Sequence, residues 1–211
     1  MFDWFKKKTE KTEEKPNAPE VLGLRLGGAF ELDDLKFRML EPELTIDGAS
    51  RTQLIQAVGE VKLDSQTTLL RYYTDDDGYI QVLLNGEGDI GVLEVKLFYF
   101  YETKSIDLET TWNRWIETDL VQPSQQLDDH EFTKVWDNDR PVAMTEKTYH
   151  SNGKISETDQ FIMLYERDAT PDLAESLVIS CEESFENGSA ERCVTYITGV
   201  DLSPTDFTVI G

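Results

Sequence analysis

Alternating apolar residues, interrupted by short turn signals, constrain this chain more than any other feature. In residues 51–63, "RTQLIQAVGEVKL", an apolar or small residue stands at every second position from Ile55 to Leu63, which is the period of a β-strand with one buried face. Residues 91–106, "GVLEVKLFYFYETKSI", form a longer β-rich run. One of its faces is apolar throughout. The other carries Glu94 and Lys96 and has large apolar residues only near its C-terminal end, at Phe98 and Phe100. This run predicts a central strand that is partly covered on its second face.

Two Asn-Gly pairs mark hairpins in the second half of the chain, at 152–153 and 187–188. Asn-Gly is favoured in two-residue hairpin loops because both positions need a positive φ. At the second pair, a two-residue loop places Glu183 opposite Arg192, whereas a three-residue loop would place Glu183 opposite Glu191. Since like charges directly opposite each other destabilise a strand pair, we expect the first register. A third hairpin is expected around a three-residue loop of Asp76, Asp77 and Gly78, with Gly78 at the left-handed position and Thr74 opposite Ile80.

Helical periodicity appears in two segments between these β-rich parts. The first, 107–120, places four large apolar residues on one side: Leu108, Trp112, Trp115 and Ile116. The second, 128–137, begins with Asp128 as a candidate cap and carries a buried stripe of Phe132, Val135 and Trp136. The sequence therefore predicts a mainly β to α+β fold, with antiparallel sheet or sheets built from hairpins and one or two helices packed against them.

The composition divides the chain into a tail and a body. Residues 1–20 are rich in Lys, Glu and Pro and lack apolar periodicity, which predicts a disordered charged tail. Residues 21–211 are expected to form a single acidic, β-rich globular domain. The helical segment could divide this domain into two lobes, 21–106 and 138–211, and the sequence leaves open whether the lobes share a sheet.

The charge is unevenly distributed. The chain has a formal net charge of −22, yet its first 20 residues carry five Lys and five Asp or Glu. The remaining residues carry 15 Lys or Arg against 37 Asp or Glu, so the whole excess lies on the body. Such a surface repels phosphate backbones, which argues against nucleic-acid binding. It favours a basic protein partner, or alternatively a cationic ligand or a metal ion.

The first residues combine aromatic and basic side chains, a composition typical of interfacial membrane anchors. The residues concerned are Phe2, Trp4, Phe5, Lys6, Lys7 and Lys8. No apolar run approaches the roughly 20 residues that span a bilayer, and the sequence does not begin with a secretory signal. We expect a cytoplasmic protein with weak peripheral contact to the inner membrane through this segment.

Residues 86–91 contain a literal G-x-G-x-x-G, formed by Gly86, Gly88 and Gly91. In dinucleotide-binding loops a helix follows these glycines and its N-terminus receives the pyrophosphate. Here a β-branched and aromatic run follows instead, and Glu87 and Asp89 would bring negative charge to a diphosphate. We interpret the motif as a connection between strands and expect no cofactor.

Few residues suggest catalysis or metal binding. The candidate metal ligands are Asp128, Asp129, His130 and Glu131, but adjacent residues point in different directions and no His-rich motif of zinc sites is present. The two cysteines, Cys181 and Cys193, are expected to be reduced thiols, and their redox role is left open. The helical spacing of the tryptophans favours core positions over a ligand groove. No catalytic residue is predicted.

Two stretches, "LGLRLGGAFELDDLKFRML" (22–40) and "LLRYYTDDDGYIQVL" (69–83), resemble the YjfK-like family of bacterial proteins, which carries a domain of unknown function. The likeness covers nearly the whole chain from residue 21. The resemblance implies a cytosolic protein, often encoded beside membrane-stress proteins, and it supplies no functional residue. We therefore expect a non-enzymatic accessory protein that docks through its acidic surface. The alternative is an enzyme or small-ligand binder with an acidic pocket.

Overall fold

The computed structural model describes residues 17–186 and 189–210, and the fold is mainly β with two short helices, as expected. The elements in chain order are β1 (Ala29–Leu32), α1 (Asp34–Leu40), β2 (Thr52–Lys62), β3 (Thr67–Thr74), β4 (Gly78–Asn85), β5 (Val92–Ser105), α2 (Glu109–Glu117), β6 (Ser124–Leu127), β7 (His130–Lys134), β8 (Val142–His150), β9 (Ile155–Thr170), β10 (Leu173–Glu186), β11 (Ser189–Asp201) and β12 (Phe207–Ile210). Short 3₁₀ turns lie at Glu41–Glu43, Asp89–Gly91 and Asp119–Val121.

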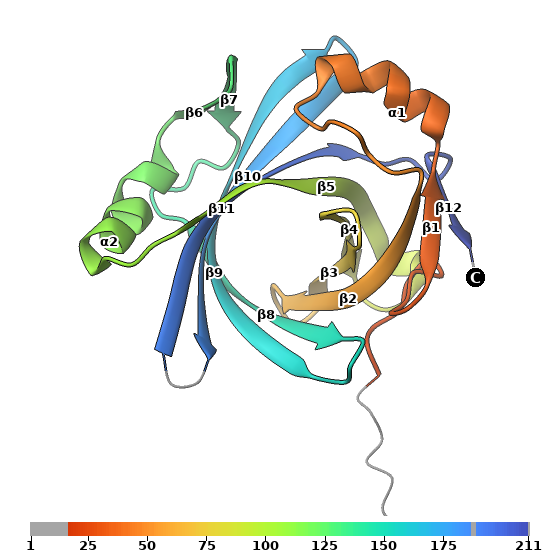
Figure 1. Ribbon diagram of the computed structural model, residues 1–211, viewed down its shortest axis with the longest axis horizontal. Coiled ribbons are helices and arrows are strands. Elements are labelled where there is room, and N and C mark those ends of the chain that lie inside the picture. Colours follow the sequence, from red (N-terminus) through yellow and green to blue (C-terminus); the bar gives the residue numbers. More distant parts are fainter. Residues whose placement is uncertain (1–16, 187–188, 211) are drawn as a thin grey trace, which may run out of the picture.

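Eight strands form a closed antiparallel ring, seen end-on in Figure 1. Around the ring, the order is β2, β3, β4, β5, β11, β10, β9 and β8, and β8 then pairs with β2 again. The closing pairs join Ala57 to His150 and Val61 to Glu146, far apart in the chain. Strands from both β-rich segments of the sequence therefore belong to one sheet.

Two strand pairs extend this ring because β2 and β9 each share one edge between two partners. The first residues of β2 pair with β1, which also pairs with β12. Tyr165 and Glu166 in the second half of β9 pair with β7, which also pairs with β6. These extensions lie beside the ring and carry the segments that cover its outer surface (Figure 1).

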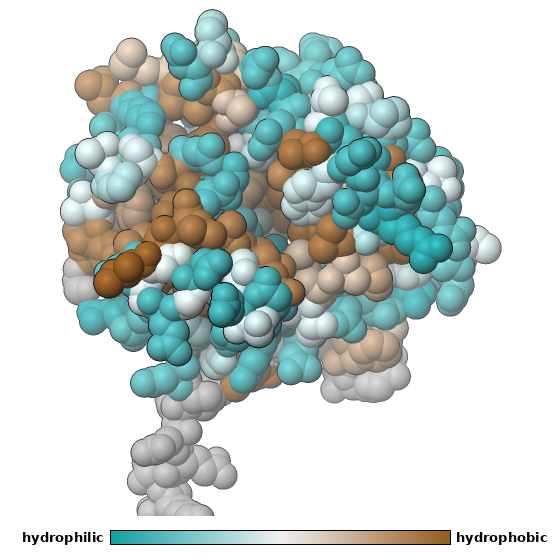
Figure 2. Space-filling model, turned by 180° about the vertical axis from the view of Figure 1, so that it is seen from behind, coloured by the Kyte–Doolittle hydropathy of each residue, from teal (hydrophilic) through white to brown (hydrophobic). Residues whose placement is uncertain are grey.

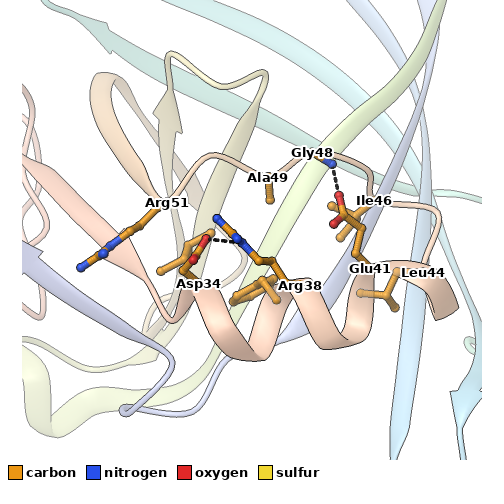
Figure 3. Close-up of a pocket in the computed structure, with 10 residues that line it drawn as sticks. Asp34, Arg38, Glu41, Leu44, Ile46, Gly48, Ala49 and Arg51 are labelled. Carbon is orange, nitrogen blue, oxygen red and sulfur yellow. Dashed lines mark hydrogen bonds and ion pairs between the residues drawn. The ribbon is translucent and has the colours of Figure 1, made fainter.

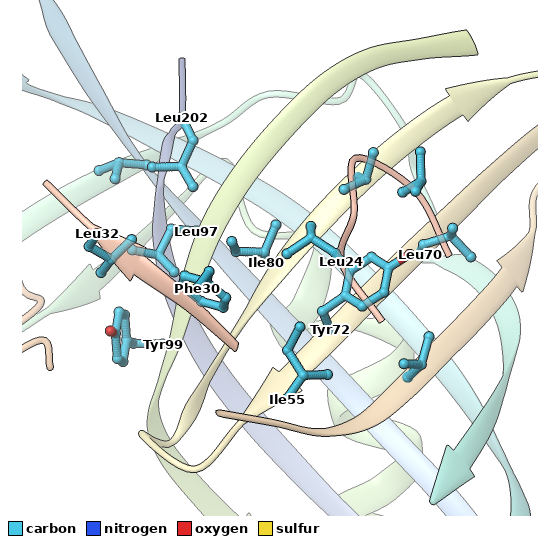
Figure 4. Packing of buried hydrophobic residues seen from close by; sticks show 14 of the residues in the cluster. Leu24, Phe30, Leu32, Ile55, Leu70, Tyr72, Ile80, Leu97, Tyr99 and Leu202 are labelled. Atoms are coloured by element: carbon cyan, nitrogen blue, oxygen red, sulfur yellow. The ribbon is translucent and has the colours of Figure 1, made fainter. Parts of the chain in front are cut away.

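The outer surface of the ring is buried in two places. Over β2 to β5, Leu70, Tyr72 and Ile80 pack against residues of the N-terminal segment and β1, among them Leu24 and Phe30 (Figure 4). Over β9 to β11, a second cluster packs beneath α2 and the β6–β7 hairpin: Trp112, Leu120, Phe132, Met163, Tyr165 and Ile179. Trp112 of α2 thus lies in a core and Trp115 packs against it, as their helical spacing predicted.

The predicted helix over 128–137 is wrong, because these residues form most of the β6–β7 hairpin. Asp128 adopts a positive φ of 52° in the turn, and Phe132 alone is buried between exposed Glu131 and Thr133, a period of two. The short apolar pattern of this segment fits a helix or a strand, and pairing with β6 and β9 makes it a strand. Besides α2, the other helix of the described fold is α1, and Asp33 caps it by accepting hydrogen bonds from two backbone N–H groups.

The predicted register of the Asp-rich hairpin is wrong. Its loop is residues 75–77, Tyr72 lies opposite Ile80 in place of Thr74, and Asp77 takes the positive φ, 52°, that was expected of Gly78.

The registers of the two Asn-Gly hairpins follow the sequence in one case and depart from it in the other. Cys181 lies opposite Val194 and Glu183 opposite Arg192, as expected, although the turn at 187–188 lies outside the described residues. In the β8–β9 hairpin, His150 and Lys154 close a three-residue loop in place of the predicted two-residue loop. Gly153 takes the left-handed position there, with φ +82°.

Residues 1–16 fall outside the described part, and with them most of the predicted tail (1–20) and the membrane-contact residues Phe2 to Lys8. In the described part, no helix is long and apolar enough to cross a membrane. From behind, Figure 2 shows apolar side chains reaching the surface among hydrophilic ones. The most exposed large apolar side chains include Leu35, Met39 and Ile90.

Candidate functional site

The inside of the closed ring is the candidate site, because its side chains do not fill it. Alternate residues of every strand point inward, and two cavities lie between them. The first, of about 440 Å³, is the apolar chamber, and its walls include Leu69, Leu83, Phe98, Met144, Ile162 and Val178. The second, of about 300 Å³, is the polar chamber, and its walls include Tyr73, Tyr79, Phe100, Glu146, Gln160 and Glu182. Arg71 lines both chambers.

Arg71, Glu146 and Gln160 form a polar crossbar between the chambers. The Arg71 Nη1 donates to Glu146 Oε2 at 2.5 Å and to Gln160 Oε1 at 2.8 Å, and its Nε donates to Gln81 Oε1 at 3.1 Å. The side chains of Arg71 and Glu146 are only 6% and 3% exposed. Removing two charges from water costs free energy, and these additional hydrogen bonds offset part of that cost.

The other carboxylate oxygen of Glu146 is also satisfied. It accepts hydrogen bonds from the Tyr73 hydroxyl at 2.7 Å and from the Thr148 hydroxyl at 3.2 Å. Gly59, on the neighbouring β2, leaves room for it, since a Cβ there would lie 2.1 Å from Glu146 Oε1. The absence of a side chain at Gly59 therefore permits the crossbar to form.

The electrostatics of the crossbar hold Arg71 in its charged form. Burial alone would lower its pKa, but Glu146, and next Tyr73 and Tyr79, raise the pKa above its ordinary value. Burial raises the pKa of Tyr73 well above its usual range, and the neighbouring Glu146 adds to this. At the crossbar, the ring interior thus contains a fixed positive charge at neutral pH, together with neutral phenols.

The apolar chamber is covered by the segment that links β7 to β8. Val135 and the partly buried Trp136 come from this segment and line the chamber beside Leu164 and Val142. At one end stand Glu94, Lys96 and Glu166, and Lys96 Nζ pairs with Asp201 at 2.6 Å. Burial raises the pKa of Glu94, which Lys96 lowers and Asp201 raises.

A groove outside the ring, between α1 and the loop that follows it, is the alternative location (Figure 3). It measures about 310 Å³ and includes Phe37 and Ile46 in its floor. Its charged groups already have partners: Arg38 pairs with Asp34 at 3.0 Å, and Glu41 accepts a hydrogen bond from the Gly48 backbone N–H. Because these groups already compensate one another, the groove offers a ligand less than the ring interior does.

The sequence-predicted metal ligands do not converge. Asp128 and Asp129 form the β6–β7 turn, where Asp128 accepts a hydrogen bond from the Tyr101 hydroxyl at 2.7 Å, and His130 and Glu131 begin β7. Among the described residues, no group of three or more His, Cys, Asp or Glu side chains could hold a metal ion. Both cysteines are free, and Cys181 is buried in the outer cluster over β9 to β11.

The glycine motif is a strand connection, as predicted. Gly86 and Gly88 take positive φ angles of 87° and 68°, and β5 follows without a helix longer than one 3₁₀ turn. Asp89 accepts a hydrogen bond from the Leu22 backbone N–H at 2.7 Å. The acidic residue that would repel a diphosphate therefore anchors the N-terminal segment.

Sequence reasoning missed the residues of the crossbar. Arg71 interrupts the apolar run "LLRYY", and a charged residue on a strand covered on both faces signals a buried polar site. The face of β5 that carries Glu94 and Lys96 was expected to be partly covered, and it lines the apolar chamber. Trp136, expected in a core, lines the same chamber.

The structure thus defines a class of protein with a closed antiparallel sheet and two internal cavities. Within this class, the chain belongs to the family described as "Protein of unknown function (DUF2491)", which matches residues 1–208. It is 33% identical over 212 residues to "Uncharacterized protein YjfK" of Escherichia coli strain K12, covering 93% of this chain and 95% of that protein. No solved structure gives a significant match.

Proposed function

We propose that this protein binds a small, largely apolar organic molecule in the apolar chamber. The chamber itself is the observation that carries the proposal. Eight-stranded closed sheets either fill their interior with side chains or hold one small ligand. Here the interior retains about 440 Å³, enclosed mainly by aliphatic and aromatic side chains with a few polar groups. That combination is typical of small-molecule binding sites.

The polar groups at the chamber would orient such a ligand. Gln81 and Arg71 lie on one wall, and the Lys96 ammonium lies at the end near Glu94. Leu63 and Glu94 are partly exposed at that end, which offers an entry from solvent. Trp136 comes from the linking segment, so its fluorescence should report occupancy of the chamber.

A binding experiment with an uncharged fluorescent probe tests the proposal. N-phenyl-1-naphthylamine, whose emission rises on leaving water, should bind with saturation and a 1:1 ratio. It should also quench the emission of Trp136, and Trp136→Phe should remove that part of the quenching. Val178→Trp should fill the chamber and abolish binding, because Val178 points into it from β10.

A matched control separates blocked binding from general disturbance. Leu54→Trp introduces the same side chain on β2, at a position that is 52% exposed. This variant should bind the probe as the unchanged protein does, and circular dichroism should show all variants folded. Absence of saturable binding, or equal binding by the Val178→Trp variant, would contradict the proposal.

A second candidate function is docking of a basic protein partner on the acidic surface. It is favoured by the way the positive charges are used. Of the 15 Lys and Arg residues beyond residue 20, at least ten pair with carboxylates among the described residues. The remaining carboxylates leave a strongly negative exterior, which would steer a basic partner.

This second function predicts a salt-sensitive complex. A pull-down from bacterial lysate with membranes retained should recover a basic protein at low salt and lose it at high salt. The full chain and a chain lacking residues 1–20 should behave alike if docking uses the body. A partner retained equally at high salt would argue against electrostatic docking.

A further inference from the structure

The polar chamber differs chemically from the apolar chamber and is not explained by the ligand proposed above. It lies across the crossbar, holds about 300 Å³, and is walled by aromatic and acidic side chains. Thr148, Ser156 and Thr158 stand near its His150 end, where His150 Nε2 and Ser156 Oγ lie 2.8 Å apart. Phe100 is 39% exposed, so the chamber has access to solvent.

The chamber contains more negative than positive charge. Glu146 is neutralised by Arg71, but Glu182, which also lines the chamber, has no ion-pair partner among the described residues. Its Oε1 accepts only a long hydrogen bond from Gln160 Nε2, at 3.3 Å. Burial raises the pKa of Glu182, and Glu146 adds to the increase. Glu182 is therefore a carboxyl group without a counter-ion among the described residues, and a bound cation would favour its charged form.

A neighbouring hydroxyl group is also unsatisfied. Ser180 precedes Glu182 on the same inward face of β10 and is only 2% exposed. Its Oγ has no partner in hydrogen-bonding geometry within the described structure, although it lies close enough to Glu182 to lower that group's pKa. A buried polar group without a partner costs free energy. Ser180 thus adds a second polar group without a full complement of hydrogen bonds next to Glu182 on β10.

Aromatic rings line the wall of the chamber. The ring centroids of Tyr73 and Tyr79 lie 5.1 Å apart, and those of Tyr79 and Phe100 lie 5.7 Å apart. The protein already places one cation against this group, since the Arg71 guanidinium carbon lies 5.7 Å from the Tyr79 ring centroid. Aromatic faces next to a carboxylate are the surroundings that proteins use to bind organic ammonium groups.

We propose that the polar chamber is a second binding site, which takes a small organic ammonium ion. The positive charge would lie against Glu182 and the aromatic wall formed by Tyr73, Tyr79 and Phe100. At about 300 Å³, the chamber lies at the small end of the range found for ligand pockets, which suits a small molecule. The inference does not depend on what the apolar chamber binds.

Other ligand classes fit this chamber less well. A hard divalent cation requires six or more oxygen ligands, whereas aromatic rings form much of this wall. An anion would meet Glu182 and Glu146 together, with only Arg71 to attract it. A neutral molecule would leave the Glu182 carboxylate without a counter-charge, which is less favourable than an ion pair.

The test compares three probes that share one ring and differ in charge: benzylammonium, benzyl alcohol and benzoate. Binding is measured by isothermal titration calorimetry on the full chain at neutral pH, in about 150 mM salt to screen the exterior. Benzylammonium should bind with saturation, and the alcohol about tenfold more weakly, because it lacks the charge-assisted contact. Benzoate should not bind. Equal affinity for all three, or no binding of benzylammonium, would overturn the proposal.

Variants then locate the site. Glu182→Gln should weaken benzylammonium binding about tenfold, whereas Glu191→Gln removes an equal charge at an exposed position of β11 and should leave it unchanged. If the two variants weaken binding equally, benzylammonium binds only to the acidic exterior and the proposal fails. Val178→Trp, which blocks the apolar chamber, should leave benzylammonium binding intact. Loss of benzylammonium binding in that variant would indicate that the cation binds in the apolar chamber, which would contradict the proposal.

A further variant keeps the test decisive if Glu182→Gln does not fold. Phe100→Leu retains an apolar side chain at a partly exposed position and removes one aromatic face. It should weaken benzylammonium binding about threefold, the size expected of one cation–π contact, and leave N-phenyl-1-naphthylamine binding unchanged. Unchanged affinity for benzylammonium in this variant would count against the aromatic wall as part of the site.

Discussion

Arg71→Met should be strongly destabilising, because it leaves Glu146 charged inside the ring. The Glu146 side chain is 3% exposed and loses its only ion pair among the described residues. Removing one partner of a buried pair typically costs about 3–5 kcal/mol. Glu146 keeps hydrogen bonds from Tyr73, Thr148 and Gln160, so we expect the lower end, about 3 kcal/mol. In a chain of this length that is a fall of roughly 6–12 °C in the unfolding temperature.

The assay is urea unfolding followed by far-ultraviolet circular dichroism, and a double variant provides the control. Arg71→Met with Glu146→Met removes both charges and should lie within about 1–2 kcal/mol of the unchanged protein, because a buried pair can be replaced by apolar residues at little cost. The residual loss would reflect the Tyr73 hydroxyl, which then lacks its acceptor. The reasoning is refuted if Arg71→Met costs less than about 1 kcal/mol, or if the double variant is less stable than the single one.

Three further predictions concern the same interior and the nearby thiols. Gly59→Ala should destabilise by about 1–3 kcal/mol in the same urea assay, because the new Cβ would meet Glu146 Oε1 at 2.1 Å; unchanged stability would show that the carboxylate can move aside. Since burial raises the pKa of Glu182, the stability it contributes is present at acidic pH and is lost as the pH rises through its folded-state pKa. Glu182→Gln should therefore gain stability relative to the unchanged protein toward neutral pH in a pH series, and a difference that is constant with pH would contradict this. Burial raises the pKa of Cys181 to about 12, so in a Cys193→Ser background iodoacetamide should label Cys181 only after unfolding; labelling of the native protein would contradict its burial.

The sequence predicted the strands better than it predicted which face each strand buries. The alternation from Ile55 to Leu63 correctly indicates β2. However, the pairing of β2 with β3 shifts between Ile55 and Ala57. Ile55 therefore packs in the outer cluster, whereas Ala57 lines the polar chamber. A bulge changes the face without changing the local pattern, so periodicity alone could not reveal it.

The candidate site was beyond sequence reasoning for a different reason. The ring closes because residues 57–61 of β2 pair with residues 146–150 of β8. No local pattern encodes a contact over that separation, and without it neither Glu146 nor Gln160 would be placed near Arg71. The predicted metal ligands, residues 128–131, share only their adjacency in the chain. The structure shows that adjacency in the sheet, not in the sequence, gathers the polar groups.

The interior of the ring is also the place where this fold forgoes stability. Its outer faces over β2 to β5 and β9 to β11 are packed with apolar residues in the ordinary way. Inside, the same strands carry a buried ion pair, a second carboxylate and an unpaired hydroxyl beside two cavities. Apolar side chains that filled this space would be neutral or stabilising by comparison. A chain that needed only a stable sheet would gain by such a filling, and we therefore infer that ligand binding accounts for the cavities and the charged groups between them.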